Sequence, residues 1–306
     1  MENTKSKSDQ NLVVLNLDEI SRQELDDYGI HHEILDYASD KNETSFAEET
    51  DGVVTVVYQL LDNPEGHINI HHQIPRVTPM TFVVKEDTLY IFTNKKTQPL
   101  LDRLDENVNK EGSALRLLFN YLTAFTKEYF AIMETIGEER EKLIKQLRKK
   151  PNKKNLKGLA NLQSGSVYIL MGSQQNSAML SDFRDLPSYD NISDHEKEAV
   201  RDTMIEAKQL SNMCSLHSKV LEQLASSYNN VLSNNLNDNV TTLTIISIGI
   251  AMFAAVTSFY GMNVKLPFEK TDSTWIWVVL LTGLAALVAI IAMRKFVNSE
   301  HENKDI

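Results

Sequence analysis

Residues 240–264 read VTTLTIISIGIAMFAAVTSFYGMNV, and residues 275–293 read WIWVVLLTGLAALVAIIAM. Neither stretch contains a charged residue, and only the short segment KLPFEKTDST separates them. A helix needs about 20 mainly apolar residues to cross the hydrocarbon core of a bilayer, and both stretches reach that length. A charge at the centre of such a helix opposes insertion by about 3 kcal/mol, so two uncharged runs in succession predict an antiparallel pair of membrane-spanning helices. The alternative is a pair of buried core helices in a large soluble protein.

The first predicted span carries a stripe of small and polar side chains. Steps of three or four residues along the helix give the candidate pore-lining set Asn237, Thr241, Thr244, Ser247, Ala251, Ala254 and Ser258. Bulky apolar residues such as Leu243, Ile246 and Phe253 occupy the other faces. One helix cannot enclose a pore, so such a stripe predicts that several copies associate around a common axis. The alternative is close helix packing without a channel, which small residues also permit.

The first span ends on Tyr260-Gly261-Met262-Asn263, and Trp275 and Trp277 begin the second span after a proline-containing loop. This arrangement resembles the CorA family of magnesium transporters, whose signature is Tyr-Gly-Met-Asn at the outer end of the first of two C-terminal spans. The resemblance in architecture covers the whole chain, although the sequence signal is concentrated after about Asp194. It implies that Tyr260, Gly261, Met262 and Asn263 form the selectivity motif.

An amide in this motif suits the chemistry of magnesium. Mg²⁺ gives up its waters reluctantly, and a ring of Asn263 side-chain oxygens from several copies can accept hydrogen bonds from those waters, as an outer-sphere metal site. A carboxylate ring would hold the ion more tightly and slow its release. Gly261 is expected to permit the backbone turn that brings Asn263 over the axis. Glu269 and Asp272 in the following loop are candidates for attracting cations, although two lysines in the same loop oppose this.

The resemblance further implies a homopentamer that lets Mg²⁺ enter the cell down its electrochemical gradient, with Co²⁺ or Ni²⁺ as further ions. Family members close when cytosolic Mg²⁺ occupies acidic sites between neighbouring soluble domains. Asp202 lies upstream of the motif at a distance resembling that of the family's regulatory aspartate, so it is our candidate regulatory metal ligand; the alternative is an ordinary exposed charge on the helix. Glu86 and Asp87 are candidates for the partner carboxylate. No organic cofactor is expected. The alternatives are a zinc or cobalt transporter of the same fold, and a membrane-anchored sensor or scaffold without transport.

Composition limits the other functions. The formal net charge of −11 argues against a nucleic-acid partner and suits a protein that handles cations. A single cysteine, Cys214, excludes an intramolecular disulfide and fits a reducing compartment. The first residues, MENTKSKSDQN, lack the apolar segment of a signal peptide, so we expect a plasma (inner) membrane protein with both termini cytoplasmic. No P-loop, nucleophile elbow or HExxH pattern supports an enzyme.

The region before the spans mixes strand and helix patterns. We expect strands at 11–17, 52–61, 77–84 and 88–93, the last two joined by the turn Lys85-Glu86-Asp87. We expect a helix at 18–36, with a capping box at Ser21-Arg-Gln-Glu24, and an acidic loop at 40–51. Long helices follow at 113–150, at 156–183 and from the cap candidate Ser193-Asp194-His195-Glu196 onwards, with a break at 182–194 around Pro187.

These patterns predict an α/β N-terminal cytosolic domain, then long helices and a two-helix C-terminal transmembrane hairpin; the resemblance adds a funnel-shaped homo-oligomer. The expected parts are a disordered N-terminus (1–10), the α/β domain (11–130), a long helical hairpin (131–192), a stalk helix (193–239), transmembrane helix 1 (240–262), an extracellular loop (263–274), transmembrane helix 2 (275–294) and a cytosolic tail (295–306). The histidines of the segment HINIHH, residues 67–72, lack the further ligands of a tetrahedral zinc site. Asparagines cluster just before the first span, in a juxtamembrane turn or at a pore entrance.

Overall fold

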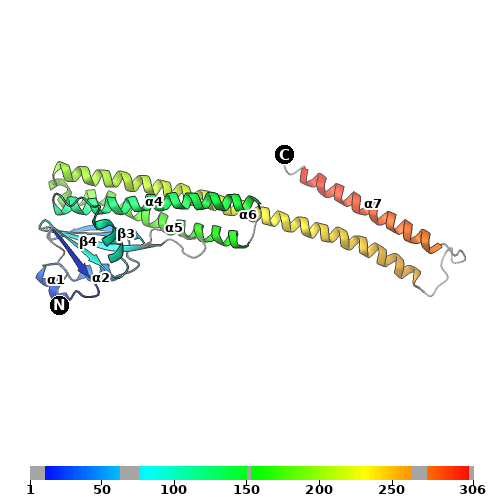
Figure 1. Cartoon of the computed structure of the whole chain (residues 1–306), viewed down its shortest axis with the longest axis horizontal. Helices are drawn as coiled ribbons and strands as arrows, with labels where there is room; N and C mark the ends of the chain where they lie inside the picture. The colour runs from blue at the N-terminus through cyan, green and yellow to red at the C-terminus, as the bar shows by residue number, and fades with distance from the viewer. Residues whose placement is uncertain (1–10, 63–75, 150–152, 263–273, 303–306) are drawn as a thin grey trace. The chain divides into compact units, whose positions relative to one another are not determined.

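The computed structural model describes residues 11–62, 76–149, 153–262 and 274–302 (Figure 1). The histidine-rich segment 67–72 and the loop that contains Asn263, Glu269 and Asp272 lie outside the described residues. Contacts divide the chain into two units, Met1–Ala225 and Ser226–Ile306, and one helix, α6 (Asp194–Tyr260), runs across the boundary. Each unit is described by itself.

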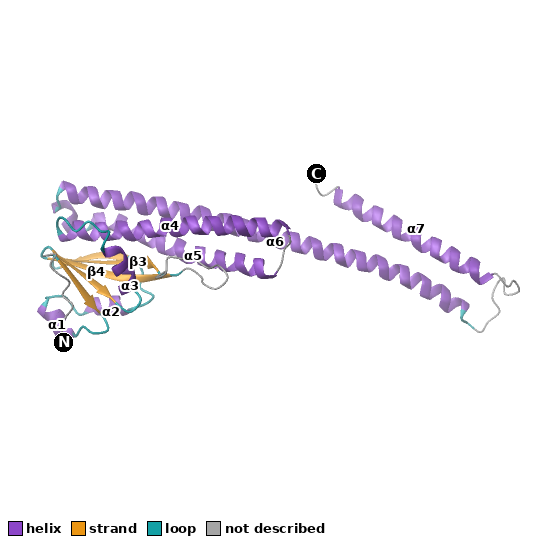
Figure 2. Cartoon of the chain, viewed as in Figure 1, coloured by secondary structure: helices purple, strands orange, loops and turns teal. Residues whose placement is uncertain are grey.

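One mixed sheet forms the centre of the first unit (Figure 2). Its strands are β1 (Leu12–Asn16), β2 (Phe46–Thr50), β3 (Val53–Leu61), β4 (Val77–Lys85) and β5 (Thr88–Thr93), in the spatial order β1-β5-β4-β3-β2. β1 is parallel to β5, and the other neighbours are antiparallel. β3 and β4 are buried along most of their lengths because both are central strands with helices on the two faces of the sheet.

Alternate side chains of the strands enter two separate cores. Tyr58, Phe82 and Ile91 pack with the helices α4 (Ala114–Lys149), α5 (Lys153–Asp182) and the start of α6. Val83 and Phe92 point to the other face, where they pack with the short helices α1 (Arg22–Asp27) and α2 (Glu33–Ser39). The expected α/β class is therefore confirmed.

Two expectations for the N-terminal region were wrong. The single helix expected at 18–36 is two short helices, because Gly29 at φ +62° ends α1 in the left-handed region that favours glycine. The acidic segment expected as a loop at 40–51 contains β2, which pairs with β3 from Phe46–Val57 to Thr50–Val53. The turn between them is Asp51-Gly52, with both residues at positive φ. Asp-Gly is a strong hairpin signal, so the sequence carried this information.

A further helix, α3 (Gln98–Asp105), was not expected from the sequence. It is fixed to α4 by an ion pair between Arg103 and Glu128 and by a hydrogen bond from the Tyr121 hydroxyl to Asp105. These partners are far apart in the sequence, so a local pattern contains no sign of them. The turn predicted at Lys85-Glu86-Asp87 is confirmed, with Glu86 and Asp87 at positive φ between β4 and β5.

The long helices α4, α5 and α6 begin and end close to the predicted positions. The capping box predicted at the start of α6 is confirmed: the Glu196 backbone N–H donates to the Ser193 hydroxyl over 3.3 Å, and the Ser193 backbone N–H donates to the Glu196 carboxylate over 2.7 Å. The predicted capping box of Ser21 and Glu24 is confirmed as well. The break before α6 contains the short 3₁₀ helices η1 (Phe183–Asp185) and η2 (Pro187–Asn191).

One buried amide joins α5 to the sheet. Asn176 accepts a hydrogen bond from the Gln59 backbone N–H over 2.8 Å and donates to the Gln59 carbonyl over 2.9 Å. Gln59 lies beyond the last residue of β3 that pairs with β2, so the Asn176 side chain supplies hydrogen bonds at the point where that pairing has stopped. The Tyr129 hydroxyl of α4 also donates to the Gln59 carbonyl, over 2.9 Å.

Candidate functional site

The second unit contains the end of α6 and the helix α7 (Thr274–Glu302). Both helices contain a stretch long and apolar enough to cross a membrane. α6 runs without a break from Asp194 to Tyr260, so the asparagines before the span lie on a helix, and of the two alternatives for them the juxtamembrane turn is wrong. The division into domains otherwise stays a prediction.

The described part of the selectivity motif is the end of α6. The Gly261 N–H donates to the Thr257 carbonyl over 2.9 Å, so the last helical turn continues into the motif. A Cβ on Gly261 would lie 3.2 Å from that same carbonyl. Gly261 lies in a turn immediately after the last residue of α6 and is not among the described residues with positive φ; its expected role in bringing Asn263 over the axis stays a prediction. Met262 is 52% exposed.

The span section of α6 has three faces, because successive residues are about 100° apart around a helix. One face packs against α7: Ile245 is buried, and a Cβ built on Gly249 would lie 3.3 Å from Ile290 of α7. A second face, with Leu243, Ile246 and Ile250, is bulky, apolar and exposed.

The candidate pore-lining residues form the third face. Its centre is about 130° from the centre of the face that packs against α7. Its exposed members in this single chain are Asn237, Thr244, Ser247, Ala251, Ala254 and Ser258. Thr241 was predicted with this set but is half-buried and lies at the edge towards α7. The stripe is therefore available to contact another copy or an ion path.

The two described hydroxyls near the middle of this stripe are oriented by the helix itself. Thr244 donates to the Val240 carbonyl and Ser247 donates to the Leu243 carbonyl, each over 2.8 Å. A hydroxyl that donates its only proton to the backbone offers its remaining lone pairs outwards as an acceptor. Water molecules around a cation present their protons outwards, so these oxygens can accept hydrogen bonds from a hydrated cation.

The regulatory candidates lie in the first unit. Asp202 is exposed on α6, and no group of three or more His, Cys, Asp or Glu that could hold a metal ion occurs among the described residues. Asp87 accepts a hydrogen bond from the Ala114 backbone N–H over 2.8 Å, at the start of α4. Asp87 therefore already has a structural role as a helix cap, whereas the Glu86 side chain is 85% exposed.

The starts of α4 and α6 are joined through one carboxylate. Ser113 donates a hydrogen bond to Glu196, and Ser193 donates to it from both its hydroxyl and its backbone. Burial would raise the pKa of Glu196, but these hydrogen bonds from Ser113 and Ser193 outweigh it and lower the pKa below its ordinary value. The sequence signalled the Ser193 cap but not the bond from Ser113.

These features define a class of protein: an α/β domain followed by long helices that end in two candidate membrane-spanning helices. The family model of the CorA-like Mg²⁺ transporter protein matches residues 12–295 of the chain. The chain therefore belongs to the CorA-like Mg²⁺ transporter family, as the resemblance in its sequence predicted.

Individual relatives are distant in sequence. The cobalt/magnesium transport protein CorA of Thermotoga maritima is 21% identical over 281 residues, which cover 88% of this chain and 76% of the relative. The complete structure of the CorA magnesium transporter from Methanocaldococcus jannaschii matches with a TM-score of 0.71 at 18% identity, over 93% of this chain and 89% of that one. The ZntB cytoplasmic domain from Vibrio parahaemolyticus matches with a TM-score of 0.57 at 10% identity, over 78% of this chain and 93% of that one. These structural matches show the fold.

Proposed function

We propose that several copies of this chain, five by the family resemblance, form a channel in the plasma membrane that conducts Mg²⁺ into the cell. The observation that carries this proposal is the exposed stripe on α6, where small side chains and outward acceptor oxygens lie away from the face that packs against α7. Family membership supports a divalent cation as the transported ion. Co²⁺ is a further candidate because the Thermotoga maritima relative is named a cobalt/magnesium transport protein.

The path would run along the stripe to the motif at the end of α6. Asn237 would stand at one end of this path and Asn263 at the other, so that amide oxygens meet the hydrated ion at both ends. An intact hydrate is the species that such a ring recognises, because Mg²⁺ dehydrates reluctantly. At a membrane potential of −100 mV, the inward movement of a divalent ion is favoured by about 4–5 kcal/mol, so no energy-coupling cofactor is needed.

Regulation would act through the first unit, with both termini of the chain in the cytoplasm. Asp202 is exposed on the same helix that lines the path, and Mg²⁺ bound between it and a carboxylate of a neighbouring copy would hold the channel closed. Asp202→Asn is expected to weaken the inhibition of influx by internal Mg²⁺. Glu222→Gln is the matched control, because Glu222 is another exposed acid of α6, about 30 Å further along the helix.

The test is Mg²⁺ influx into proteoliposomes under an imposed potential, comparing the unaltered protein with Asn263→Ala. We expect clear influx through the unaltered protein. Asn263→Ala should abolish this influx while assembly is retained, and Asn239→Ala should leave it in place. Repeating the assay with Co²⁺ and Zn²⁺ separates the magnesium channel from a cobalt or zinc transporter of the same fold. Absence of influx of any of these ions, with correct insertion and low internal Mg²⁺, would favour a membrane-anchored sensor.

A further inference from the structure

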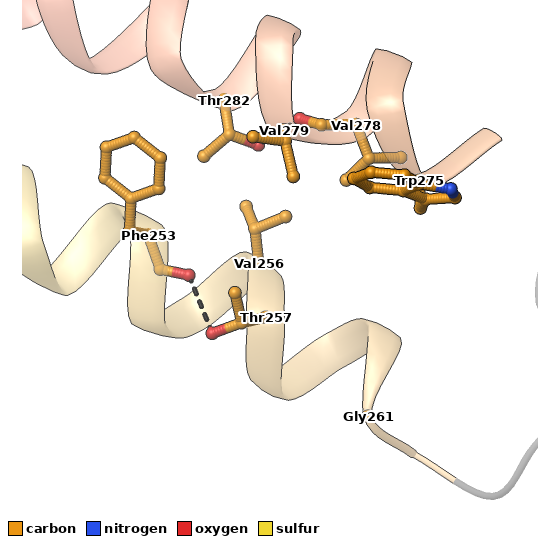
Figure 3. A pocket seen from close by; sticks show the side chains of 8 residues that line it. All are labelled: Phe253, Val256, Thr257, Gly261, Trp275, Val278, Val279 and Thr282. Carbon is orange, nitrogen blue, oxygen red and sulfur yellow. Dashed lines mark hydrogen bonds between the residues drawn. The ribbon is translucent and has the colours of Figure 1, made fainter. Parts of the chain in front are cut away.

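A pocket lies between α6 and α7 near the end of α6 that carries the motif (Figure 3). Its volume is about 310 Å³, at the lower end of the range of pockets that hold small ligands. Phe253 and Val256 of α6 point towards Val279 and Thr282 of α7 across it (Figure 3). The complete lining is Phe253, Val256, Thr257, Gly261, Trp275, Val278, Val279 and Thr282.

The pocket offers a ligand few hydrogen-bonding groups: the indole N–H of Trp275 and the hydroxyls of Thr257 and Thr282. Thr257 donates to the Phe253 carbonyl over 2.9 Å, shown as a dashed line in Figure 3. Thr282 donates to the Val278 carbonyl over 2.7 Å. Both hydroxyl protons are therefore engaged within their own helices, which leaves only acceptor lone pairs, and none of the lining residues is charged. A polar or charged occupant would recover few of the hydrogen bonds that it makes with water, so the chemistry favours a hydrocarbon.

The depth of the pocket fits a hydrocarbon chain that enters from the level of the membrane surface. Gly261 and Trp275 lie at the ends of the two spans, and tryptophan is enriched at the boundary between lipid and water. Phe253 lies eight residues before Gly261, which corresponds to about 12 Å along a helix. The pocket thus extends from the level of the membrane interface about two turns into the hydrocarbon region.

The surroundings of the pocket favour lipid over a second copy of the chain. Its α6 residues lie about 150° around the helix from the centre of the pore stripe, so copies that associate through that stripe leave the pocket on the outside. The outer face of α7, about 150° around that helix from the pocket, is also exposed and apolar, and it includes Ile276, Leu280 and Leu284. In a membrane, that surface is in contact with acyl chains.

We infer that this pocket between α6 and α7 binds an acyl chain of a bilayer lipid, next to the end of α6 that carries Gly261 and Met262. The choice of lipid over a second copy rests on the proposed pore orientation of the stripe. A lipid in the pocket supports the last turn of α6 against α7, so ion flux is expected to depend on the bound acyl chain. Filling the pocket with protein side chain should displace the lipid.

The two tryptophans of the chain provide a direct assay. Trp275 lines the pocket, whereas Trp277 lies about 200° further around α7 and does not line it. Both are about equally exposed, at 67% and 66%. The full-length protein with Trp277→Phe therefore reports on the pocket, and the protein with Trp275→Phe is the matched control for ordinary lipid contact.

We would add phospholipid with brominated acyl chains, which quench tryptophan fluorescence, in increasing mole fraction. Quenching of Trp275 is expected to include a component that saturates at a low mole fraction of brominated lipid. Quenching of Trp277 is expected to rise only in proportion to that mole fraction. Val256→Phe should abolish the saturating component and reduce Mg²⁺ flux, whereas Leu284→Phe on the exposed face of α7 should do neither. Val279→Phe fills the pocket from the other helix and guards against a folding defect in one variant.

Proportional quenching of both tryptophans, or saturation that survives Val256→Phe and Val279→Phe, would overturn the inference. A further variant combines Val279→Cys with Cys214→Ser, so that position 279 carries the only thiol. Disulfide-linked dimers of this variant, together with no saturable quenching of Trp275, would show that a second copy fills the pocket instead. The quenching assay does not depend on transport. Saturable binding in a protein without flux would refute the proposed channel alone, and flux that needs Asn263 without saturable binding would refute the lipid site alone.

Discussion

Hydrogen bonds of single side chains separate the polar residues of this chain into those that hold the fold and those left for function. Asn176 bonds to the backbone of Gln59 in β3 and accepts a hydrogen bond from the Ser45 hydroxyl, and Asp87 caps α4. Thr244 and Ser247 donate to their own helix and present only acceptors outwards. Asn237 is exposed on the stripe. An exposed amide at this position is consistent with recognition of a hydrated ion.

Asn237 and Asn239 allow a test with one chemical change at two faces of the same helix. Both are exposed, but they lie about 160° apart around α6. Asn237→Ala is expected to lower Mg²⁺ influx by about tenfold, the effect of losing about 1.4 kcal/mol of interaction with the hydrated ion. Asn239→Ala should stay close to the unaltered protein in the same proteoliposome assay. Equal effects of the two substitutions would contradict the assignment of the stripe.

Asn176→Ala is expected to destabilise the first unit by about 3 kcal/mol, because the buried Gln59 N–H loses its hydrogen-bond partner. Gln174→Ala changes an exposed residue two positions earlier on α5 and should alter stability by less than about 0.5 kcal/mol. Denaturant unfolding of the full chain in detergent, followed by circular dichroism, measures both. A loss below about 1 kcal/mol for Asn176→Ala would show that the amide link is dispensable.

At the scale of the helix, α6 combines a stripe of small residues with bulky neighbours one step away. Ala251 lies on the stripe and Ile250 about 100° from it. Ala251→Leu is expected to reduce Mg²⁺ influx by at least about tenfold, since each copy in a ring adds three carbon atoms to the path. Ile250→Leu keeps the volume of a lipid-facing side chain and should retain influx. Retained influx in Ala251→Leu, with assembly intact, would exclude this face as the pore wall.

The contact between α4 and α6 gives the first unit a pH dependence. Burial, and then the positive charge of Arg140, lower the pKa of His217 below its ordinary value of 6.5. The unfolded chain therefore binds a proton at His217 more readily than the folded chain does. The contribution of this histidine to the free energy of unfolding is fully present above pH 6.5 and is lost as the pH falls towards the folded pKa. Thermal melts of the full chain are expected to show this loss, and His217→Gln should reduce it. His195→Gln, at an exposed site of α6, is the control that should leave it unchanged.

Elements whose formation depends on local pattern could be predicted from the sequence. The spans follow from long uncharged runs, and the capping box at Ser193 and Glu196 follows from residue spacing. β2 was missed because only Phe46 and Ala47 give it apolar character, and its pairing with β3 stabilises an otherwise polar strand. α3 was missed although its sequence carries a local signal, with Pro99 in the first turn and the apolar residues Leu100, Leu101 and Leu104 behind it.

The candidate site could be predicted in part for the same reason. A helical period places Thr244, Ser247 and Ala251 on one face, and the structure shows that this face is exposed. The lipid pocket needs side chains from two helices, and no single period in the sequence contains it.

The whole molecule joins a charged first unit to an apolar second unit through one helix. The formal net charge of −11 attracts cations to the protein, and α6 connects Asp202 to the stripe without a break in the helix. Ligand binding at Asp202 could thus bias the position of the path-lining helix. Regulation of this kind requires contacts between copies of the chain. Because Asp202 lies outside the proposed path, Asp202→Asn should alter the response to internal Mg²⁺ and leave the maximal influx unchanged.

The most direct test of the central claim is the effect of a water-soluble, positively charged thiol reagent on Mg²⁺ influx through assembled channels. Cys214, the single cysteine of the chain, is first replaced with serine, and Ala251→Cys is compared with Ile246→Cys, about 140° away on the apolar face. We predict that the reagent modifies Ala251→Cys and blocks influx, while Ile246→Cys neither reacts nor loses influx. Modification and block at Ile246→Cys with none at Ala251→Cys would place the water-filled path on a different face and contradict the account.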